Sequence, residues 1–267
     1  MLNIVVCIKA VPDPAKADSI KIDPVKMTLI RKDIPMVLNP LDKFALEAAL
    51  NLKEEKGAHI MVISMGPPKA ASIVKECMAL GADKGMLLSD KSFGGADAFA
   101  TAYTLASGIK KLESFDVVFC GMASSDGATE WVGPQIASFL DTPVVTMVNT
   151  IEENETQTWT VKADFDNGYR RVKVQLPAVF TVTRHLNQPR TLSFSGIIKA
   201  RKKQVEILDL EQLGVDNKKM GANGSPTIVS KMETTQNKRK ITMIQGTLEE
   251  KADTVFKLLK ESGCLAK

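Results

Sequence analysis

Apolar runs of six to nine residues alternate with longer amphipathic segments over the first 150 residues of the chain. The runs are rich in Val, Ile, Leu and Met, which is typical of strands buried on both faces. The expected strands cover residues 3–11, 59–66, 84–90, 116–121 and 143–148. Apolar residues at helical spacing between them predict helices over 39–57, 69–81 and 96–112.

The order of these elements predicts an α/β fold. Strands that alternate with helices form parallel sheets through right-handed crossovers, so we expect an open, mostly parallel sheet with helices on both faces. The pattern changes near residue 150, because residues 156–185 alternate apolar and polar positions around the turn Asp166-Asn167-Gly168. This stretch predicts antiparallel strands that extend the sheet, and residues 21–33 predict a smaller surface hairpin.

The last part of the chain is expected to be an extended arm. Beyond Pro189 the sequence is irregular and polar until a final amphipathic helix over 247–263. Residues 195–267 do not easily build a core of their own, so they would be more stable on another surface. We therefore expect an α/β domain over residues 1–194, whose loops are considered below as a binding site, and, over 195–267, an arm that packs on a partner subunit.

Composition and charge exclude several classes of protein. Hydrophobic residues make up 44% of the chain and charged residues 25%, which is ordinary for a globular protein. The formal net charge is only +4 and the basic residues are spread out, so nucleic-acid binding is not indicated. The sequence has no apolar stretch of membrane-spanning length and no secretion signal, so we expect a cytoplasmic protein without membrane insertion.

Cysteine and histidine give no sign of a metal site or a catalytic triad. The four cysteines are widely spaced without a CxxC pair, and for the three that lie inside apolar segments a reduced, buried thiol is the expected state. The only histidines, His59 and His185, exclude a histidine-rich metal site and give poor support to a Ser-His-Asp triad. We predict no metal ligand and no catalytic residue, because no side chain is required as a general acid or base.

Small, polar and turn-forming residues follow almost every predicted strand, in the stretches 10–14, 65–68, 89–97 and 121–134. Ligands of open α/β sheets bind outside the carboxyl ends of the strands, so these loops are candidates for a binding site. In Gly94-Gly95-Ala96-Asp97, free N–H groups at the start of the following helix attract phosphate. The commoner role of Asp97 is to cap that helix, and capping is the favoured interpretation.

The loop "CGMASSDGATEWVGP" at 120–134 is the stronger candidate. Asp126 and Gly127 predict a tight turn, and Thr129 offers a hydroxyl near free helical N–H groups. Pro134 restricts the start of the next helix to about residues 130–133. The loop is neither a Walker loop nor a GxGxxG fingerprint, and it contains no lysine. It favours a phosphate or diphosphate of a nucleotide without showing what chemistry takes place there.

Eight motifs occur in a fixed order along nearly the whole chain: "NIVVCIKAVPD", "NPLDKFALEAALNLKE", "VISMGPP", "ALGADKGMLLSD", "GADAFATA", "DGATEWVGPQIA", "LNQPR" with "IIKARKK", and "NGSPT". Together they resemble the beta subunit of the electron-transfer flavoproteins. The resemblance implies an α/β domain whose loops bind an adenine nucleotide. It also implies a C-terminal arm that wraps around an alpha subunit carrying FAD.

The resemblance allows two branches of this family. In the bifurcating branch the beta subunit binds a second FAD, which takes a hydride from NADH. One electron then goes to ferredoxin or flavodoxin, and the other goes through the alpha-subunit FAD to a flavin dehydrogenase of the acyl-CoA or lactate type. In the other branch the nucleotide is AMP and is structural. The loops "SFGGADAFAT" and "DGATEWVGP" resemble the bifurcating branch more closely. The subunit alone is then expected to be non-catalytic, and an ATP-binding regulator of similar fold is the unrelated alternative.

The resemblance also implies roles for individual residues. For partner docking these are Phe194, Arg190 and Lys199. Phe194 is expected to be an exposed anchor in a loop, with packing on its own domain as the alternative. The residues implied around the nucleotide are Ala10, Asn39, Asp42, Met65, Gly66, Asp90, Gly94, Ala96, Asp97, Thr101, Gly121, Asp126, Gly127, Thr129, Val132, Gly133 and Pro134.

The chain departs from the family pattern in the same loop. Met122 and Ala123 stand where the family usually has a basic residue and then Gln, and Ser125, Ala128 and Trp131 also differ. In the predicted hairpin the departures are Ala163 and Arg170. These changes remove one cation and several polar groups near the implied ligand. They leave backbone contacts to phosphate possible and weaken the case for side-chain contacts to a flavin.

Overall fold

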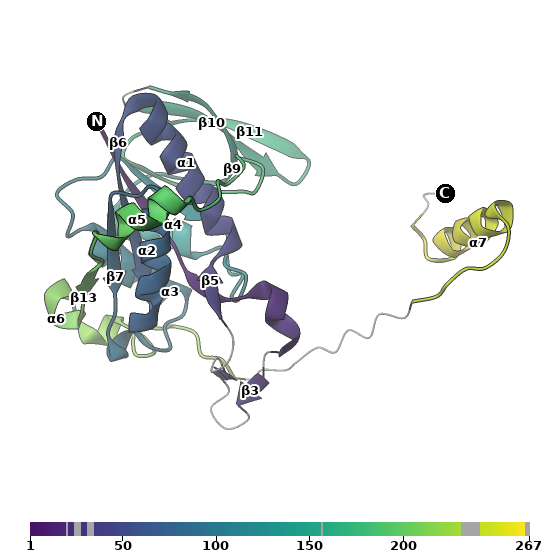
Figure 1. The fold of residues 1–267 in the computed structure, drawn as a ribbon, viewed down its shortest axis with the longest axis horizontal. Coiled ribbons are helices and arrows are strands. Elements are labelled where there is room, and N and C mark those ends of the chain that lie inside the picture. The colour runs from purple at the N-terminus through teal and green to yellow at the C-terminus, as the bar shows by residue number, and fades with distance from the viewer. Residues whose placement is uncertain (20, 24–27, 31–34, 156, 231–240, 265–267) are drawn as a thin grey trace. The chain divides into compact units, whose positions relative to one another are not determined.

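The computed structural model describes residues 1–19, 21–23, 28–30, 35–155, 157–230 and 241–264. The chain divides into two units, Met1–Lys231 and Met232–Lys267, which are described separately. The described part of the first unit is built on a nine-stranded sheet (Figure 1). Among the described residues, no helix is both long and apolar enough to cross a membrane.

In the part of the chain that the structure describes, seven strands of the main sheet pair in parallel. In spatial order these are β9 (Val144–Asn154), β12 (Ala178–Val182), β8 (Val117–Gly121), β1 (Leu2–Cys7), β6 (Ala58–Met65), β7 (Lys84–Leu88) and β13 (Glu206–Leu208). Beyond β9 the sheet is extended by β10 (Thr158–Phe165) and β11 (Gly168–Gln175), which pair antiparallel. The predicted hairpin with its turn at 166–168 is therefore confirmed.

Helices cover both faces of the main sheet. Two helices, α1 (Pro40–Lys56) and α2 (Ala71–Leu80), pack on one face of the sheet. The helices α3 (Ala98–Ile109) and α4 (Val132–Leu140) pack on the other face. Within β1 the side chains alternate, so that Ile4 and Val6 join the core under α1 and α2, whereas Val5 and Cys7 join the core under α3 and α4. The predicted α/β fold, an open and mostly parallel sheet with helices on both faces, is therefore confirmed.

The expected strand over residues 3–11 is wrong in its second half. β1 ends at Cys7, and β2 (Ala10–Pro12) pairs with β5 (Met36–Leu38) in a separate two-stranded sheet. The break has a local cause, because the backbone N–H of Lys9 donates to the Asp42 carboxylate instead of to a strand. The chain therefore turns towards α1 at this point.

Two other strand predictions have different outcomes. In the hairpin expected over 21–33, β3 (Lys21–Asp23) and β4 (Thr28–Ile30) pair antiparallel, and its other residues lie outside the described ranges. The expectation that all strands of 156–185 are antiparallel is wrong for β12, which is parallel to both of its neighbours. All of its residues are buried, as is typical of a central parallel strand.

Residues 194–220 form elements that the sequence pattern does not indicate. They include α5 (Phe194–Arg201), β13 and α6 (Leu210–Leu213). α5 packs on α2, where a Cβ added to Gly196 would lie only 2.2 Å from the carbonyl oxygen of Ala79. Met220 is buried in the core under α3. The expected division near residue 194 and the arm on a partner subunit stay predictions.

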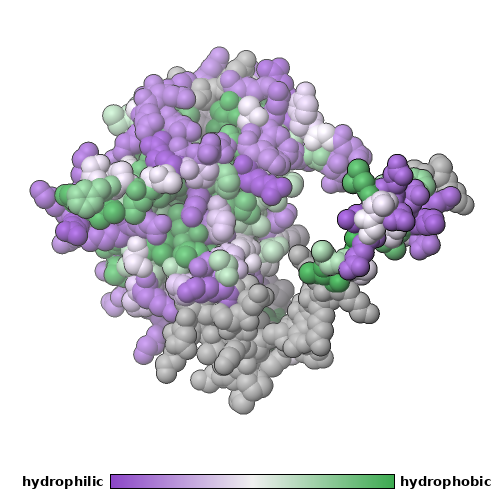
Figure 2. All heavy atoms as spheres, turned by 45° about the vertical axis from the view of Figure 1, so that its right-hand side comes forward, coloured by the Kyte–Doolittle hydropathy of each residue, from purple (hydrophilic) through white to green (hydrophobic). Residues whose placement is uncertain are grey.

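The second unit contains the predicted C-terminal helix, α7 (Leu248–Glu261). Its first turn is closed by a capping box, in which the side chains of Thr247 and Glu250 each accept a hydrogen bond from the backbone of the other. Its apolar residues, including Phe256 at 59% exposure, lie open on the unit's own surface. Green, hydrophobic side chains are visible on this unit in Figure 2.

The core beside the hairpin gives a prediction about stability. Trp159 is fully buried, and its ring stacks on Phe180 with 5.3 Å between the ring centroids. We expect Trp159→Ala to lower the free energy of unfolding by about 3–5 kcal/mol, because it leaves a cavity under the hairpin. Urea titration of the purified protein measures this change.

The other tryptophan provides the matched control. Trp131 is 64% exposed, and we expect Trp131→Ala to change the free energy of unfolding by less than about 0.5 kcal/mol. Equal losses in the two variants would contradict the assignment of Trp159 to the core.

Candidate functional site

The candidate site lies where the parallel strands end, since ligands of such sheets bind at the shared carboxyl edge. Ala10 lies in β2, Asn39 and Asp42 lie at the start of α1, and Met65 and Gly66 lie at the end of β6. Asp90, Gly94, Ala96, Asp97 and Thr101 lie between β7 and the first turns of α3. Gly121, Asp126, Gly127, Thr129, Val132, Gly133 and Pro134 lie between the end of β8 and the first turn of α4.

Asp42 joins three elements of this edge. Its carboxylate accepts hydrogen bonds from the backbone N–H of Lys9 at 2.7 Å and from the side-chain amide of Asn39 at 2.8 Å. A Cβ added to Gly121 would lie 2.4 Å from an oxygen of the same carboxylate. Glycine at 121 therefore lets the end of β8 approach the first turn of α1.

The Asp42 carboxyl is also the unusual titrating group of the site. The residue is only 5% exposed. Burial raises the pKa of Asp42 to about 7, and the hydrogen bonds that the carboxylate accepts offset this rise only in part. This edge of the sheet therefore holds a carboxyl group whose charge changes near neutral pH.

Asn39 holds the loop that follows β8. Its side-chain amide donates to the carbonyl oxygen of Ala123 at 2.9 Å, and its side-chain oxygen accepts from the backbone N–H of Ser125 at 3.1 Å. Asn39 is fully buried while it makes these contacts. The loop over residues 122–131 is therefore tied to the start of α1 through backbone atoms, which do not depend on the side chains at 123 and 125.

Lys9 supplies a cation that the sequence analysis missed. Its ammonium group lies 2.6 Å from a carboxylate oxygen of Asp126 and 3.3 Å from the hydroxyl of Ser124. A lysine just beyond β1 thus forms an ion pair with the loop that carries Met122. The sequence pattern placed Lys9 inside the expected strand over residues 3–11, so it gave no sign that this side chain reaches the loop after β8.

The start of α4 is the part of the site best suited to an anion. The helix begins at Val132, within the predicted range, and no side-chain hydrogen bond caps it in the described structure. Ala128 and Glu130 precede it with φ of 47° and 60°, a left-handed conformation that costs energy for residues other than glycine. The loop thus delivers the first N–H groups of α4 to the edge of the sheet.

The structure shows a packing role for Gly133, and the ligand contact that the family resemblance implies stays a prediction. A Cβ at this position would lie 2.3 Å from the methyl carbon of Thr181 on β12. Its small size therefore lets the first turn of α4 pack against the sheet, and contact with a ligand is not needed to explain the glycine.

The start of α3 is already occupied by protein groups. Asp97 caps the helix by accepting from the N–H of Ala100 at 3.0 Å, so the capping interpretation is confirmed. The same carboxylate accepts from the N–H and hydroxyl of Thr227, and the N–H of Asp97 donates to the hydroxyl of Ser225. Burial raises the pKa of Asp97, but these hydrogen bonds outweigh it and leave the pKa below its ordinary value.

Asp90 is likewise committed to local structure. It caps the short 3-10 helix over Lys91–Phe93, where it accepts from the N–H and the hydroxyl of Ser92. These hydrogen bonds lower the pKa of Asp90. The carbonyl oxygen of Gly94 accepts a hydrogen bond from the N–H of Ala222, so residues beside the "NGSPT" motif close over this loop.

The hydrogen bonds of Ser225 and Thr227 to Asp97 were not predicted from the sequence, because these residues lie more than 120 positions from Asp97.

The three residues implied in partner docking lie in two environments. Phe194 is 79% exposed, so it does not pack into its own domain. It begins α5 instead of lying in a loop, because Ser193 caps the helix there. Lys199 is exposed in the last turn of α5. Arg190 is held by the carboxylates of Glu47 and Glu54 on α1.

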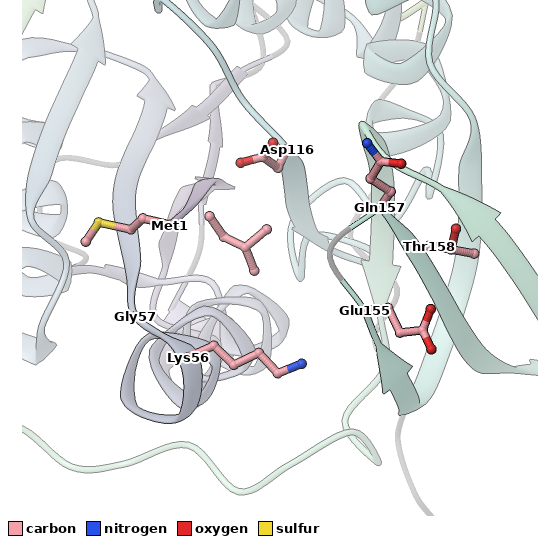
Figure 3. Close-up of a pocket in the computed structure, with 8 residues that line it drawn as sticks. Met1, Lys56, Gly57, Asp116, Glu155, Gln157 and Thr158 are labelled. Carbon is pink, nitrogen blue, oxygen red and sulfur yellow. The ribbon is translucent and has the colours of Figure 1, made fainter.

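A cavity of about 840 Å³ lies at the opposite edge of the sheet (Figure 3). It is formed by the start of β1, the end of α1 and the segments that precede β8 and β10. None of the predicted site residues lines it. Within the described ranges, no three His, Cys, Asp or Glu side chains are grouped so as to hold a metal ion. The lining residues are Met1, Leu2, Lys56, Gly57, Asp116, Glu155, Gln157 and Thr158.

The amino-acid sequence is similar to a known protein family and to several named proteins. The family model described as the electron transfer flavoprotein domain matches residues 26–213. An electron transfer flavoprotein subunit beta of Clostridium acetobutylicum is 45% identical over 97% of this chain and 98% of its own length. Subunit CarD of the caffeyl-CoA reductase-Etf complex of Acetobacterium woodii is 42% identical, with 97% and 98% covered. The acryloyl-CoA reductase electron transfer subunit gamma of Anaerotignum propionicum is 36% identical, with 97% and 99% covered.

The buried carboxyl predicts a pH dependence of stability. The pKa of Asp42 is higher in the folded chain, at about 7, than its ordinary value of 3.8, so the folded state holds this proton more tightly. The stability that this group contributes is therefore complete below about pH 4 and is lost as the pH rises towards 7. We expect Asp42→Asn to remove this part of the pH dependence.

Urea titrations between pH 4 and pH 8 measure the effect as the difference between the two proteins at each pH. The free energy of unfolding of the wild type should fall relative to that of Asp42→Asn by a few kcal/mol across this range. Parallel pH profiles would show that Asp42 titrates at its ordinary pKa.

Proposed function

This chain belongs to the electron transfer flavoprotein family as a beta subunit, which confirms the resemblance of its motifs, and we propose that it holds FAD at the carboxyl edge of its sheet. Its role in electron transfer follows from the family. The finer proposal is a bifurcating complex that oxidises NADH. One electron goes to ferredoxin or flavodoxin, and the other goes through the FAD of an alpha subunit to a flavin dehydrogenase.

The start of α4 is the observation that carries this proposal. Within the described ranges no side-chain hydrogen bond caps its first turn, and it lies at the edge where ligands of parallel sheets bind. Such a helix start attracts the diphosphate of a dinucleotide through its N–H groups and its dipole. The start of α3 is less suitable, because Asp97 already caps it.

The residues around α4 support the same fit. Asn39 and Asp42 fix the backbone of the loop and of Lys9, so the loop is ordered by the protein itself. The ion pair of Lys9 with Asp126 adds a further tie between this loop and the residues that follow β1. When bound, a flavin can take up a hydride and release its electrons one at a time, while the chain binds and orients it.

The names of the relatives bear on the partner dehydrogenase. Two of them are subunits named for caffeyl-CoA reductase and acryloyl-CoA reductase. We therefore propose an acyl-CoA dehydrogenase as the partner, with a lactate-type enzyme as the alternative. The exposed apolar residues of α7 support the proposal that the arm packs on an alpha subunit.

The nucleotide content of the purified complex tests this proposal. The chain is produced together with its alpha subunit, and the bound nucleotides are released and quantified. Two FAD per heterodimer, with bleaching of the flavin absorbance by NADH, is the expected result. One FAD with one AMP would contradict the proposal. It would indicate the branch of the family in which the beta subunit holds a structural AMP, because the same helix start can hold the phosphate of AMP. ATP without flavin would indicate a regulatory protein.

The loop itself gives a separate prediction. Asp126→Ala removes the carboxylate that holds Lys9, so the loop over 122–131 loses one of its ties and the start of α4 is less well presented. We expect the FAD content of the beta-subunit site to fall several-fold. Quantified FAD per heterodimer measures this, and equilibrium dialysis against FAD gives the change in affinity.

Asp166→Ala serves as the control, because Asp166 is an exposed aspartate in the turn between β10 and β11. It should leave the FAD content unchanged. If Asp126→Ala retained as much FAD as this control, the loop would not be the binding site.

A further inference from the structure

Arg190 forms a dense set of contacts with one face of α1. Its Nε lies 2.9 Å and 3.1 Å from the two carboxylate oxygens of Glu47, and its Nη2 lies 3.0 Å from one of them. Its Nη1 lies 2.6 Å from an oxygen of Glu54, and Nη2 also donates to Asn51 at 3.3 Å. The three acceptors are four and three residues apart, so they share one face of the helix. We call this set the Arg190 clasp.

The clasp is more than a surface ion pair. Glu47 is only 6% exposed, and its carboxylate also accepts the backbone N–H of Arg190 at 3.0 Å. A buried carboxylate requires such partners, because its charge is otherwise poorly solvated. The hydrogen bond from Arg190 also lowers the pKa of the exposed Glu54. Both the side chain and the main chain at residue 190 are thus fixed by α1.

The clasp holds the segment that leads into α5. Before it, the side-chain amide of Asn187 donates to the carbonyl oxygen of Phe44 on α1 at 2.9 Å. After it come Leu192, Phe194, Ile197 and Ile198, which are 41%, 79%, 37% and 45% exposed. We call residues 192–198 the docking strip. It lies between the clasp on α1 and the packing of α5 on α2.

We infer that Arg190 is a positioning residue, which fixes the first part of the docking strip on α1 and does not itself contact the partner dehydrogenase. The guanidinium group has its donors directed to three acceptors of its own chain. Glu47, which anchors it, is too deeply buried to meet a partner protein. This inference rests on the proposed function, because the strip needs a dehydrogenase to dock.

Buried Glu47 makes a positioning role distinguishable from a direct contact. Arg190→Gln and Glu47→Gln each break the clasp, but only the first changes a residue with substantial exposure. If Arg190 acts through the clasp, both variants should raise the KM for the dehydrogenase about tenfold, which corresponds to roughly 1.4 kcal/mol of lost binding. Arg190→Lys keeps the charge without the planar fork, so it should restore only part of the loss.

The experiment uses the complete heterodimer. NADH-driven electron transfer is measured with an acyl-CoA dehydrogenase and, separately, with a flavin-linked lactate dehydrogenase as acceptor. FAD content and direct flavin reduction by NADH should be unchanged in both variants. Lys173→Gln, which removes one positive charge from the exposed strand β11, should leave the KM unchanged. Hydrogen exchange of residues 187–198 is measured in the same samples and should rise in both clasp variants.

Each outcome decides the inference. A higher KM with faster exchange in both variants supports the positioning role. A higher KM in Arg190→Gln alone would overturn it and make Arg190 a direct contact. An unchanged KM in both variants, or unchanged exchange in both, would also overturn the positioning role. If the wild-type complex reduces neither acceptor, the proposed function fails, and hydrogen exchange alone then decides whether the clasp holds the segment.

Discussion

The buried carboxylate of Asp42 is the contact on which the carboxyl edge of the sheet depends. It ends β1 by accepting the N–H of Lys9, it fixes the Asn39 side chain, and it requires glycine at the end of β8. Burying a carboxyl group is costly unless its oxygens are hydrogen-bonded, so the elements that supply the donors must come together at one point. The loop over 122–131 and the start of α4 take their positions from this junction.

The helix α1 connects two distant functions of the chain. Its first turn carries the Asp42 junction, and its later turns carry Glu47, Asn51 and Glu54, which hold Arg190. A rigid helix between the proposed nucleotide site and the docking strip keeps both in fixed positions on the same domain. The proposed electron transfer needs such an arrangement, because a flavin and a docking surface on one unit must present the same geometry at every encounter.

The sequence predicts those parts of the molecule that local pattern determines. The apolar runs predicted the parallel strands β1, β6, β7, β8 and β9, and Asp97 could be recognised as a helix cap from its place before an apolar segment. The end of β1, the cation supplied by Lys9 and the clasp on Arg190 could not be predicted. They arise from contacts between residues that are separated by 33, 117 and 143 positions in the sequence, and such distant contacts leave no sign in the local spacing of apolar residues. α5 was missed because its sequence has no clear apolar face of its own and its stability comes from packing on α2.

The central claim is that the nucleotide lies at the carboxyl edge, against the start of α4, and not in the cavity of about 840 Å³ at the opposite edge. Hydrogen exchange of the heterodimer, compared before and after its FAD is stripped and then restored, tests this most directly. Our account predicts that restored FAD slows exchange over residues 121–134 and leaves residues 155–158 unchanged. Slower exchange at 155–158 with none at 121–134 would place the nucleotide in the cavity and contradict the account.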